Sequence, residues 1–201
     1  TDGAGNSLDP SQPLPPATQV RLEVPPGQFK PGVTFLWYKD QFLMEKATGA
    51  SVDFVLIWKQ SISVTVMDGE KVVGSAKVDL TPSESEIPLM IDGLTDATVG
   101  IPIHVHAKVY SPGEAKPAYL VVALPDAKVQ WWLQPLDPDG TIPVMIDTSA
   151  QDNPGYLKHA VQASDDQVGA WRMILRVETS DGKIGMASQF FYVKSSPFGS
   201  Y

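Results

Sequence analysis

His104 and His106 are the residues whose type and spacing most clearly permit chemistry. Residues two apart on a strand project from the same face, so both imidazoles could bind one copper, zinc or iron ion. A third ligand such as Glu114 or His159 would be required, and Lys108 shares the histidine face, where its cation opposes a metal. We expect two solvent-facing histidines on an outer strand face; a metal-dependent enzyme or metal carrier is the alternative.

Three carboxylates form a second set. Asp137, Asp139 and Asp147 offer the oxygen ligands that calcium prefers. The run Asp137 to Gly140 lacks the third acidic position and the terminal glutamate of a calcium-binding loop, and its proline and glycine are typical of a turn. We expect a turn and no metal ligands; a calcium site at a domain junction is the lesser alternative.

Residues for covalent or cofactor chemistry are scarce. The chain has no cysteine, which excludes thiol catalysis, disulfides and thiolate metal sites. The sequence contains no G-x-S-x-G elbow, P-loop or dinucleotide-binding fingerprint. A glycosidase-type carboxylate pair is left open, because its spacing is a tertiary property. We therefore expect no enzyme, no catalytic residue and no cofactor.

Trp132 is the best candidate for a ligand-binding residue. In a strand through Val129, Trp131 and Leu133, these three side chains would face the core, and Trp132 would face outward with Gln130 and Gln134. A large aromatic ring flanked by two amides suits sugar stacking or protein docking. Coverage of Trp132 by a loop or by another part of the chain is the alternative.

The elements that position these residues are strands. Apolar and polar residues alternate in several short runs, which is typical of half-buried antiparallel strands, and Asp-Gly or Pro-Gly turns separate the runs. The phase places Trp37, Trp58 and Trp171 in a core. Residues 35–47 and 154–163 fit either a helix or a strand. We predict an all-β protein built from antiparallel sandwiches.

Composition narrows the class of protein. The 201 residues carry a formal net charge of −8 without a basic cluster, which argues against binding to nucleic acid and to anionic membranes. No apolar run is long enough to span a bilayer. At 43% hydrophobic residues, the chain can bury a core of its own.

A weak internal repeat predicts two tandem units. The hexapeptide IPLMID at 87–92 recurs as IPVMID at 142–147, and the flanking blocks resemble each other in the same order. The join lies between Ser111 and Asp126. We assign residues 19–117 to the first sandwich, 118–195 to the second, and 196–201 to a C-terminal tail.

Residues 1–18 are rich in glycine, proline and polar side chains, and this composition is typical of a flexible tether. It resembles the spacer that follows the lipidated cysteine of bacterial lipoproteins, although that cysteine is absent. We expect an exported chain, periplasmic or at the cell surface, tethered to a membrane through a processed N-terminus; a cytosolic protein with a flexible N-terminus is the alternative.

The strongest family resemblance covers residues 165–193. A glycine turn leads into a tryptophan-containing strand, then an Asp-Gly-Lys turn and a last strand from Ala187 to Val193. This pattern resembles the closing hairpin of bacterial immunoglobulin-like and macroglobulin-type modules. The resemblance implies an immunoglobulin-like sandwich that serves as a spacer, adhesin or assembly part, partnered by other proteins of an envelope or surface assembly.

Together these expectations describe a non-catalytic structural or protein-binding module of a bacterial cell envelope or surface. A carbohydrate-binding module that uses Trp132 with its glutamines, and so binds a glycan, is the first alternative. The metal-dependent protein built on His104 and His106 is the second.

Overall fold

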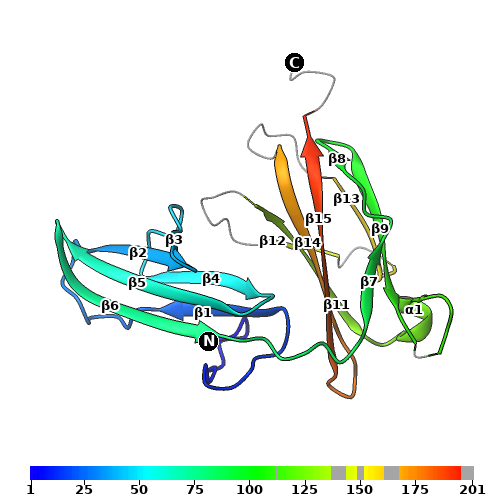
Figure 1. Ribbon diagram of the computed structural model, residues 1–201, viewed down its shortest axis with the longest axis horizontal. Coiled ribbons are helices and arrows are strands. Elements are labelled where there is room, and N and C mark those ends of the chain that lie inside the picture. The colour runs from blue at the N-terminus through cyan, green and yellow to red at the C-terminus, as the bar shows by residue number, and fades with distance from the viewer. Residues whose placement is uncertain (112, 137–143, 149–151, 161–167, 196–201) are drawn as a thin grey trace. The chain divides into compact units, whose positions relative to one another are not determined.

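The computed structural model describes residues 1–111, 113–136, 144–148, 152–160 and 168–195 (Figure 1). These described residues form two compact units, which divide between Glu84 and Ser85. The strands of each unit pair antiparallel except β8 (Ala97–Thr98), which pairs parallel with β15 (Ile184–Lys194), and the only helix among the described residues is the four-residue α1 (Leu120–Ala123). The prediction of an all-β chain with two sandwich units is confirmed.

Unit 1 contains a two-stranded and a four-stranded sheet. The first has the order β1-β4 and the second the order β3-β2-β5-β6. The strands are β1 (Thr18–Glu23), β2 (Thr34–Lys39), β3 (Phe42–Leu43), β4 (Ser51–Leu56), β5 (Gln60–Asp68) and β6 (Lys71–Leu80). Alternation places Ile62, Val64 and Val66 of β5 in a core that Phe54 and Leu56 of β4 complete from the opposite sheet.

Unit 2 is a sandwich of a four-stranded and a five-stranded sheet. One sheet joins β10, β9 and β13, with β7 on the other side of β9, and the second sheet has the order β12-β11-β14-β15-β8. The strands are β7 (Leu89–Asp92), β8 (Ala97–Thr98), β9 (Pro102–Val109), β10 (Ala118–Tyr119), β11 (Lys128–Pro135), β12 (Val144–Ile146), β13 (Tyr156–Ala160), β14 (Gly169–Glu178) and β15 (Ile184–Lys194). Side chains from both sheets share one core, with Trp131 and Met173 fully enclosed.

The two units follow the same strand order. The pairs β1-β4 and β9-β13 correspond, and so do the sheets β3-β2-β5-β6 and β12-β11-β14-β15. The chain before β1 repeats the entry into unit 2, because Asp2 bridges Val20 antiparallel and Leu14 bridges Pro82 in parallel. This is the B-E and C-F-G arrangement of immunoglobulin-like sandwiches.

The boundary between the units differs from the one that the repeat suggested near residue 117. The segment 87–92 leads into the first strand of unit 2, whereas Val144–Ile146 in its apparent copy is β12, which pairs with β11 in the middle of that unit. The hexapeptides therefore occupy different places in the sandwich. Similar alternation in similar strands explains the likeness, since every half-buried strand needs the same pattern.

Residues 1–18 are part of unit 1, which corrects the prediction of a flexible tether. Leu14 is 5% exposed, Ala17 is 1% exposed, and both are buried core residues. The Thr1 amine donates a hydrogen bond to the Arg21 carbonyl at 2.8 Å, and Arg21 N donates to Thr1 O at 2.8 Å. Bridges from Asp2 to Val20 and from Leu14 to Pro82, together with the buried Leu14 and Ala17 side chains, fix the segment.

The two ambiguous segments contain strands rather than helices. Residues 35–47 form most of β2 and all of β3, joined through Asp40 and Gln41, both with positive φ as a two-residue hairpin turn requires. In the second segment Tyr156–Ala160 is β13, and 161–163 lie outside the described residues. The core prediction is wrong for Trp58, which is 39% exposed because β4 ends at Leu56 and the alternation stops there.

We expect Leu14→Ala to lower the free energy of unfolding by about 2 to 4 kcal/mol, because it empties a site in the core of unit 1. Gln12→Ala is the matched control, since Gln12 is exposed in the same segment, and should stay within about 0.5 kcal/mol. Urea unfolding measures both. Equal, small effects would mean that the segment does not pack in solution.

Candidate functional site

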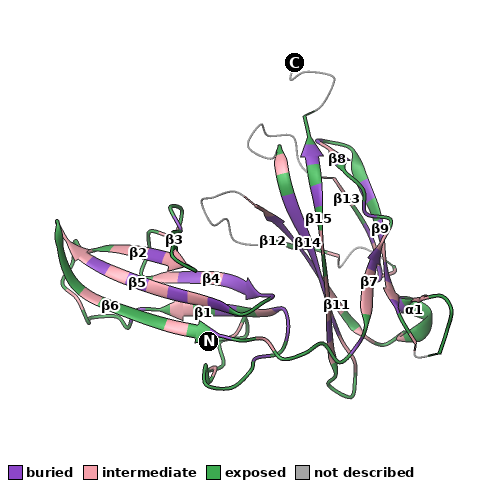
Figure 2. Cartoon of the chain, in the orientation of Figure 1, coloured by how far each residue is buried: buried purple, intermediate pink, exposed green. Residues whose placement is uncertain are grey.

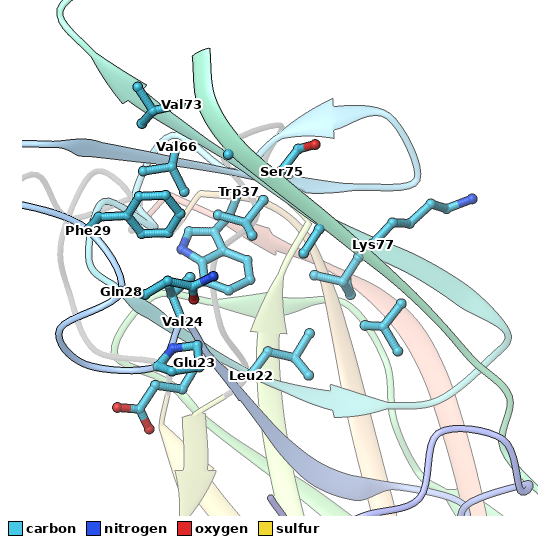
Figure 3. Close-up of a pocket in the computed structure, with 16 residues that line it drawn as sticks. Leu22, Glu23, Val24, Gln28, Phe29, Trp37, Val66, Val73, Ser75 and Lys77 are labelled. Atoms are coloured by element: carbon cyan, nitrogen blue, oxygen red, sulfur yellow. The ribbon is translucent and has the colours of Figure 1, made fainter. Parts of the chain in front are cut away.

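The candidate site is an apolar groove in unit 1, between β1 and β6 (Figure 3). It arises because the two-stranded sheet cannot cover all four strands of the other sheet, so the inner face of β6 is left partly uncovered. Ala76 pairs with the buried Val64 and therefore shares its inward face, yet Ala76 is exposed. Figure 2 shows the contrast between β6, which is mostly exposed, and β5, whose residues are alternately buried and half-buried.

The groove has a volume of about 440 Å³. Its floor contains Trp37, Ile62, Val64 and Val66, which belong to the core of unit 1. The Trp37 indole N–H donates to the Gly49 carbonyl at 2.8 Å, which fixes the ring in place. An apolar cavity of this size with fixed walls suits the side chains of a bound chain or a small apolar ligand.

Small residues on β6 create the room. Gly74, Ala76 and Val78 point inward, in register with Val66, Val64 and Ile62. A Cβ added at Gly74 would lie 2.6 Å from the tip of the Phe29 ring, so this ring rests directly on the Gly74 backbone. The groove is therefore closed by Phe29 near Gly74 and open along Ala76 and Val78.

The backbone of β6 has a free edge beside the groove. Among the described residues, no bridge or backbone hydrogen bond reaches Lys71–Asp79 from any strand other than β5. Past this stretch the edge is occupied, because Leu14 N donates to Thr81 O at 2.9 Å and Ser83 N donates to Leu14 O at 2.7 Å. The stretch thus has the unpaired donors and acceptors that could receive another strand.

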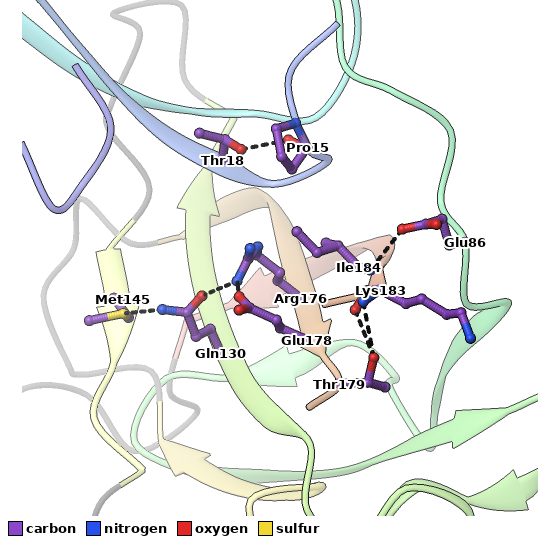
Figure 4. Close-up of polar contacts among 10 residues, drawn as sticks. All are labelled: Pro15, Thr18, Glu86, Gln130, Met145, Arg176, Glu178, Thr179, Lys183 and Ile184. Carbon is purple, nitrogen blue, oxygen red and sulfur yellow. Dashed lines mark hydrogen bonds and ion pairs between the residues drawn. The ribbon is translucent and has the colours of Figure 1, made fainter. Parts of the chain in front are cut away.

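The corresponding strand of unit 2, β15, has its edge covered. Glu86 N donates to Ile184 O at 2.9 Å, the Ser85 hydroxyl accepts from Met186 N at 3.0 Å, and Asp96 accepts from Tyr192 N at 3.2 Å. Figure 4 shows the Glu86 carboxylate at the Ile184 amide, 3.3 Å away. An open final-strand edge is therefore a feature of unit 1 rather than of the shared strand order.

Charges lie along the rim. Lys77 and Asp79 point to the outer face of β6, and their charged atoms are 3.4 Å apart. A hydrogen bond from Ser61 and the pairing with Lys77 hold the pKa of Asp79 below its usual value. Ser75 and Lys77 point away from the groove in Figure 3, and Glu23 lines the opposite rim.

The groove is built to bind rather than to react. Ser75 supplies the only hydroxyl among its lining residues, and that hydroxyl points outward. Glu23 and Lys77 are its only charged lining residues, and they lie on opposite rims. No nucleophile lies beside a base in this lining, so the arrangement provides apolar surface and free backbone groups.

His104 and His106 lie on the outer face of β9, as predicted. His104 Nδ1 shares a hydrogen bond with the Tyr156 hydroxyl, and the His106 ring stands 4.7 Å from that of Tyr156. The Lys108 ammonium is 2.6 Å from the Asp92 carboxylate, and this hydrogen bond raises the pKa of Lys108. The histidines are thus held by aromatic neighbours.

Within the described residues, no group of three or more histidine, aspartate or glutamate side chains is placed to hold a metal ion. Asp147 is exposed, whereas Asp137 and Asp139 lie outside the described residues. No helix of the described residues is long and apolar enough to span a membrane. The absence of a metal and of a cofactor in this protein stays a prediction.

The structure places Trp132 on the predicted face of β11 but not in the predicted environment. Trp131 is part of the unit 2 core, and Trp132 projects from the other face with Gln130 and Gln134. The exposed ring that sugar stacking requires is not found, because Trp132 is 2% exposed and Gln134 is 8% exposed.

Gln130 is engaged in a polar cluster on the same outer face (Figure 4). Its carbonyl oxygen accepts from Arg176 Nη1 at 3.1 Å, and the same nitrogen is 2.9 Å from the Glu178 carboxylate. The Gln130 amide nitrogen is 3.9 Å from the Met145 sulfur. Ligand binding by Trp132, Gln130 and Gln134 stays a prediction, without the accessible ring on which it was based.

Sequence reasoning missed the groove, although β6 carried a signal. The run Lys71–Leu80 alternates, but its inward positions at 74 and 76 hold glycine and alanine, where a packed strand has large apolar residues. Small inward residues next to polar outward ones indicate a strand whose inner face packs poorly. Which strand faces this gap depends on the pairing of the sheets, which the sequence does not show.

We expect Ala76→Leu to raise the free energy of unfolding by about 1 kcal/mol, because the added carbons cover the apolar floor of the groove. Ser75→Leu, on the outer face of the same strand, should give no such gain. Chemical denaturation of both variants measures the difference. A loss of stability in Ala76→Leu would show that the groove is already filled.

Comparisons with known proteins show likeness at low similarity. No family model matches the chain, and no curated protein matches it. Among solved structures, a Ca2+-stabilized adhesin that helps an Antarctic bacterium bind ice is 11% identical, with a TM-score of 0.30 over 90% of this chain and 45% of its own. The N-terminal four Ig domains of Dscam1 isoform 6.9 are 14% identical, with a TM-score of 0.26 over 94% of this chain and 45% of theirs.

The Yersinia pseudotuberculosis adhesin InvE is 13% identical, with a TM-score of 0.24 over 88% of this chain and 54% of its own. The chain thus spans about half the length of each of these three proteins. The strand order of the two units, rather than these low scores, carries the assignment of an immunoglobulin-like fold.

Proposed function

We propose that this chain is a non-catalytic protein-binding module of a bacterial cell-envelope or surface assembly, and that unit 1 contains its binding site. The observation that carries the proposal is the free edge of β6 beside an apolar groove. A partner would add an extended segment to this edge and insert alternate side chains into the groove.

Strand addition would engage both features of the site, the free backbone edge of β6 and the apolar groove beside it. The backbone groups along Lys71–Asp79 would gain hydrogen bonds, and the apolar floor around Trp37 would be removed from water. A small rigid ligand would satisfy only the second. An extended polypeptide is therefore the occupant that the site favours.

Unit 2 would act as the structural part of the module. Its strand β15 has its edge covered by Ser85, Glu86 and Asp96, so this edge is poorly suited to accept another strand. The proposed location at an envelope or cell surface rests on the resemblance of residues 165–193 to bacterial immunoglobulin-like modules. Neither the glycan nor the metal alternative gains support from the buried Trp132 or from the paired Lys108.

The test uses a labelled synthetic peptide in which isoleucine alternates with threonine, and a scrambled peptide of the same composition. Fluorescence polarisation should show binding of the alternating peptide only. Ala76→Glu places a carboxylate in the apolar groove and should weaken binding at least about tenfold, because a buried unpaired charge costs more than 1.4 kcal/mol.

Ser75→Glu is the matched control, since it adds the same charge on the outer face of β6. It should change the affinity less than about twofold, and both variants should keep the wild-type circular dichroism spectrum. Equal binding of the two peptides, or equal effects of the two substitutions, would rule out the groove as the binding site.

A further inference from the structure

Resting on the proposed function, we infer that the partner segment runs antiparallel to β6 and carries a basic residue, an apolar residue and an acidic residue in that order. The basic side chain lies opposite Asp79 and the acidic side chain opposite Lys77. Bulky apolar side chains lie opposite Val78 and Ala76, where the groove is open.

The two faces of β6 set this pattern. Val78, Ala76 and Gly74 point into the groove, and Asp79, Lys77 and Ser75 point to the outer face. Residues directly opposite each other in neighbouring strands share a face. A strand added to the β6 edge must therefore alternate apolar and polar residues in the same phase.

The inward positions favour large partner side chains. Gly74 and Ala76 leave the groove about 440 Å³ of volume beside the floor formed by Trp37 and Val64. Phe29 already covers Gly74, whereas a bulky side chain opposite Ala76 would fill open volume and raise the packing density toward that of a sandwich core. Charged side chains at these inward positions would be desolvated without a partner.

The outward positions favour opposite charges in a fixed order. The Lys77 and Asp79 side chains are 63% and 62% exposed, so their charged groups remain accessible to a partner strand. Opposite charges directly across two strands stabilise the pair, and like charges destabilise it. An acidic residue opposite Lys77 and a basic residue opposite Asp79 satisfy both positions.

Direction follows from the pairing geometry. Antiparallel pairs are slightly more stable per residue than parallel pairs, and an antiparallel strand meets Asp79 before Lys77. Its sequence therefore reads basic-apolar-acidic from the N-terminus, whereas a parallel strand would need the reverse order. The stretch of β6 open to regular pairing ends at Val73, where the β5-β6 register shifts, and at Asp79, because Thr81 O already accepts a hydrogen bond from Leu14 N.

The test compares two labelled peptide isomers, Thr-Ile-Lys-Ile-Glu-Ile-Thr-Ile-Thr and Thr-Ile-Glu-Ile-Lys-Ile-Thr-Ile-Thr. Polarisation titrations with the full chain should show the first binding about fivefold more tightly, because two cross-strand pairs change from attractive to repulsive. The variant Lys77→Glu with Asp79→Lys reverses both charges and should invert the preference. This variant keeps its own ion pair, so its fold should be retained.

The results distinguish the charge order and direction of the partner strand from the proposed binding of a strand at β6. Tighter binding of the second isomer, inverted by the charge-swapped variant, would overturn the antiparallel direction. Equal binding of both isomers to both proteins, with Ala76→Glu weakening each, would overturn the charge code and leave the proposed function standing. Failure of both isomers and of the uncharged alternating peptide would overturn the proposed function as well.

Discussion

The uncovered inner face of β6 is the constraint on which unit 1 depends. A sandwich buries an apolar face of each sheet against the other, and four strands cannot be fully covered by two. Unit 1 meets this imbalance by placing glycine and alanine on the inner face of β6, and by laying Phe29 over Gly74. A groove remains along Ala76 and Val78.

Unit 2 shows how the same strand order is completed. There β7 pairs with β9 over four residues, and β8 pairs with the end of β15. In unit 1 the corresponding pairings are two isolated bridges, from Asp2 to Val20 and from Leu14 to Pro82. The difference leaves the edge of β6 open for most of its length, so the two units of one architecture offer different surfaces.

The chemistry of this surface follows from what lines it. Apolar carbons, free backbone groups and one rim ion pair provide shape, hydrogen bonds and a directional charge pattern. The groups that catalysis would require, a nucleophile beside a base or a set of metal ligands, are not assembled in the lining of the groove. Binding specificity in such a site comes from register, because a shift by one residue turns every side chain to the wrong face.

The sequence by itself determined the local properties of this protein. Period-two alternation identified several strands, the Asp-Gly turn at 181–182 marked the β14-β15 hairpin, and the phase of β11 correctly sent Trp131 and Trp132 to opposite faces. These features depend on neighbours in the chain, which the sequence contains directly.

Only the tertiary structure decided what covers each face. It buried Trp132, exposed Trp58, fixed Leu14 in the core and left Ala76 uncovered. Alternation distinguishes the two faces of a strand but does not say which face meets another sheet, because that depends on pairing between distant segments. The unit boundary and the groove beside β6 are decided by the same long-range pairing, which is why a local pattern could not locate them.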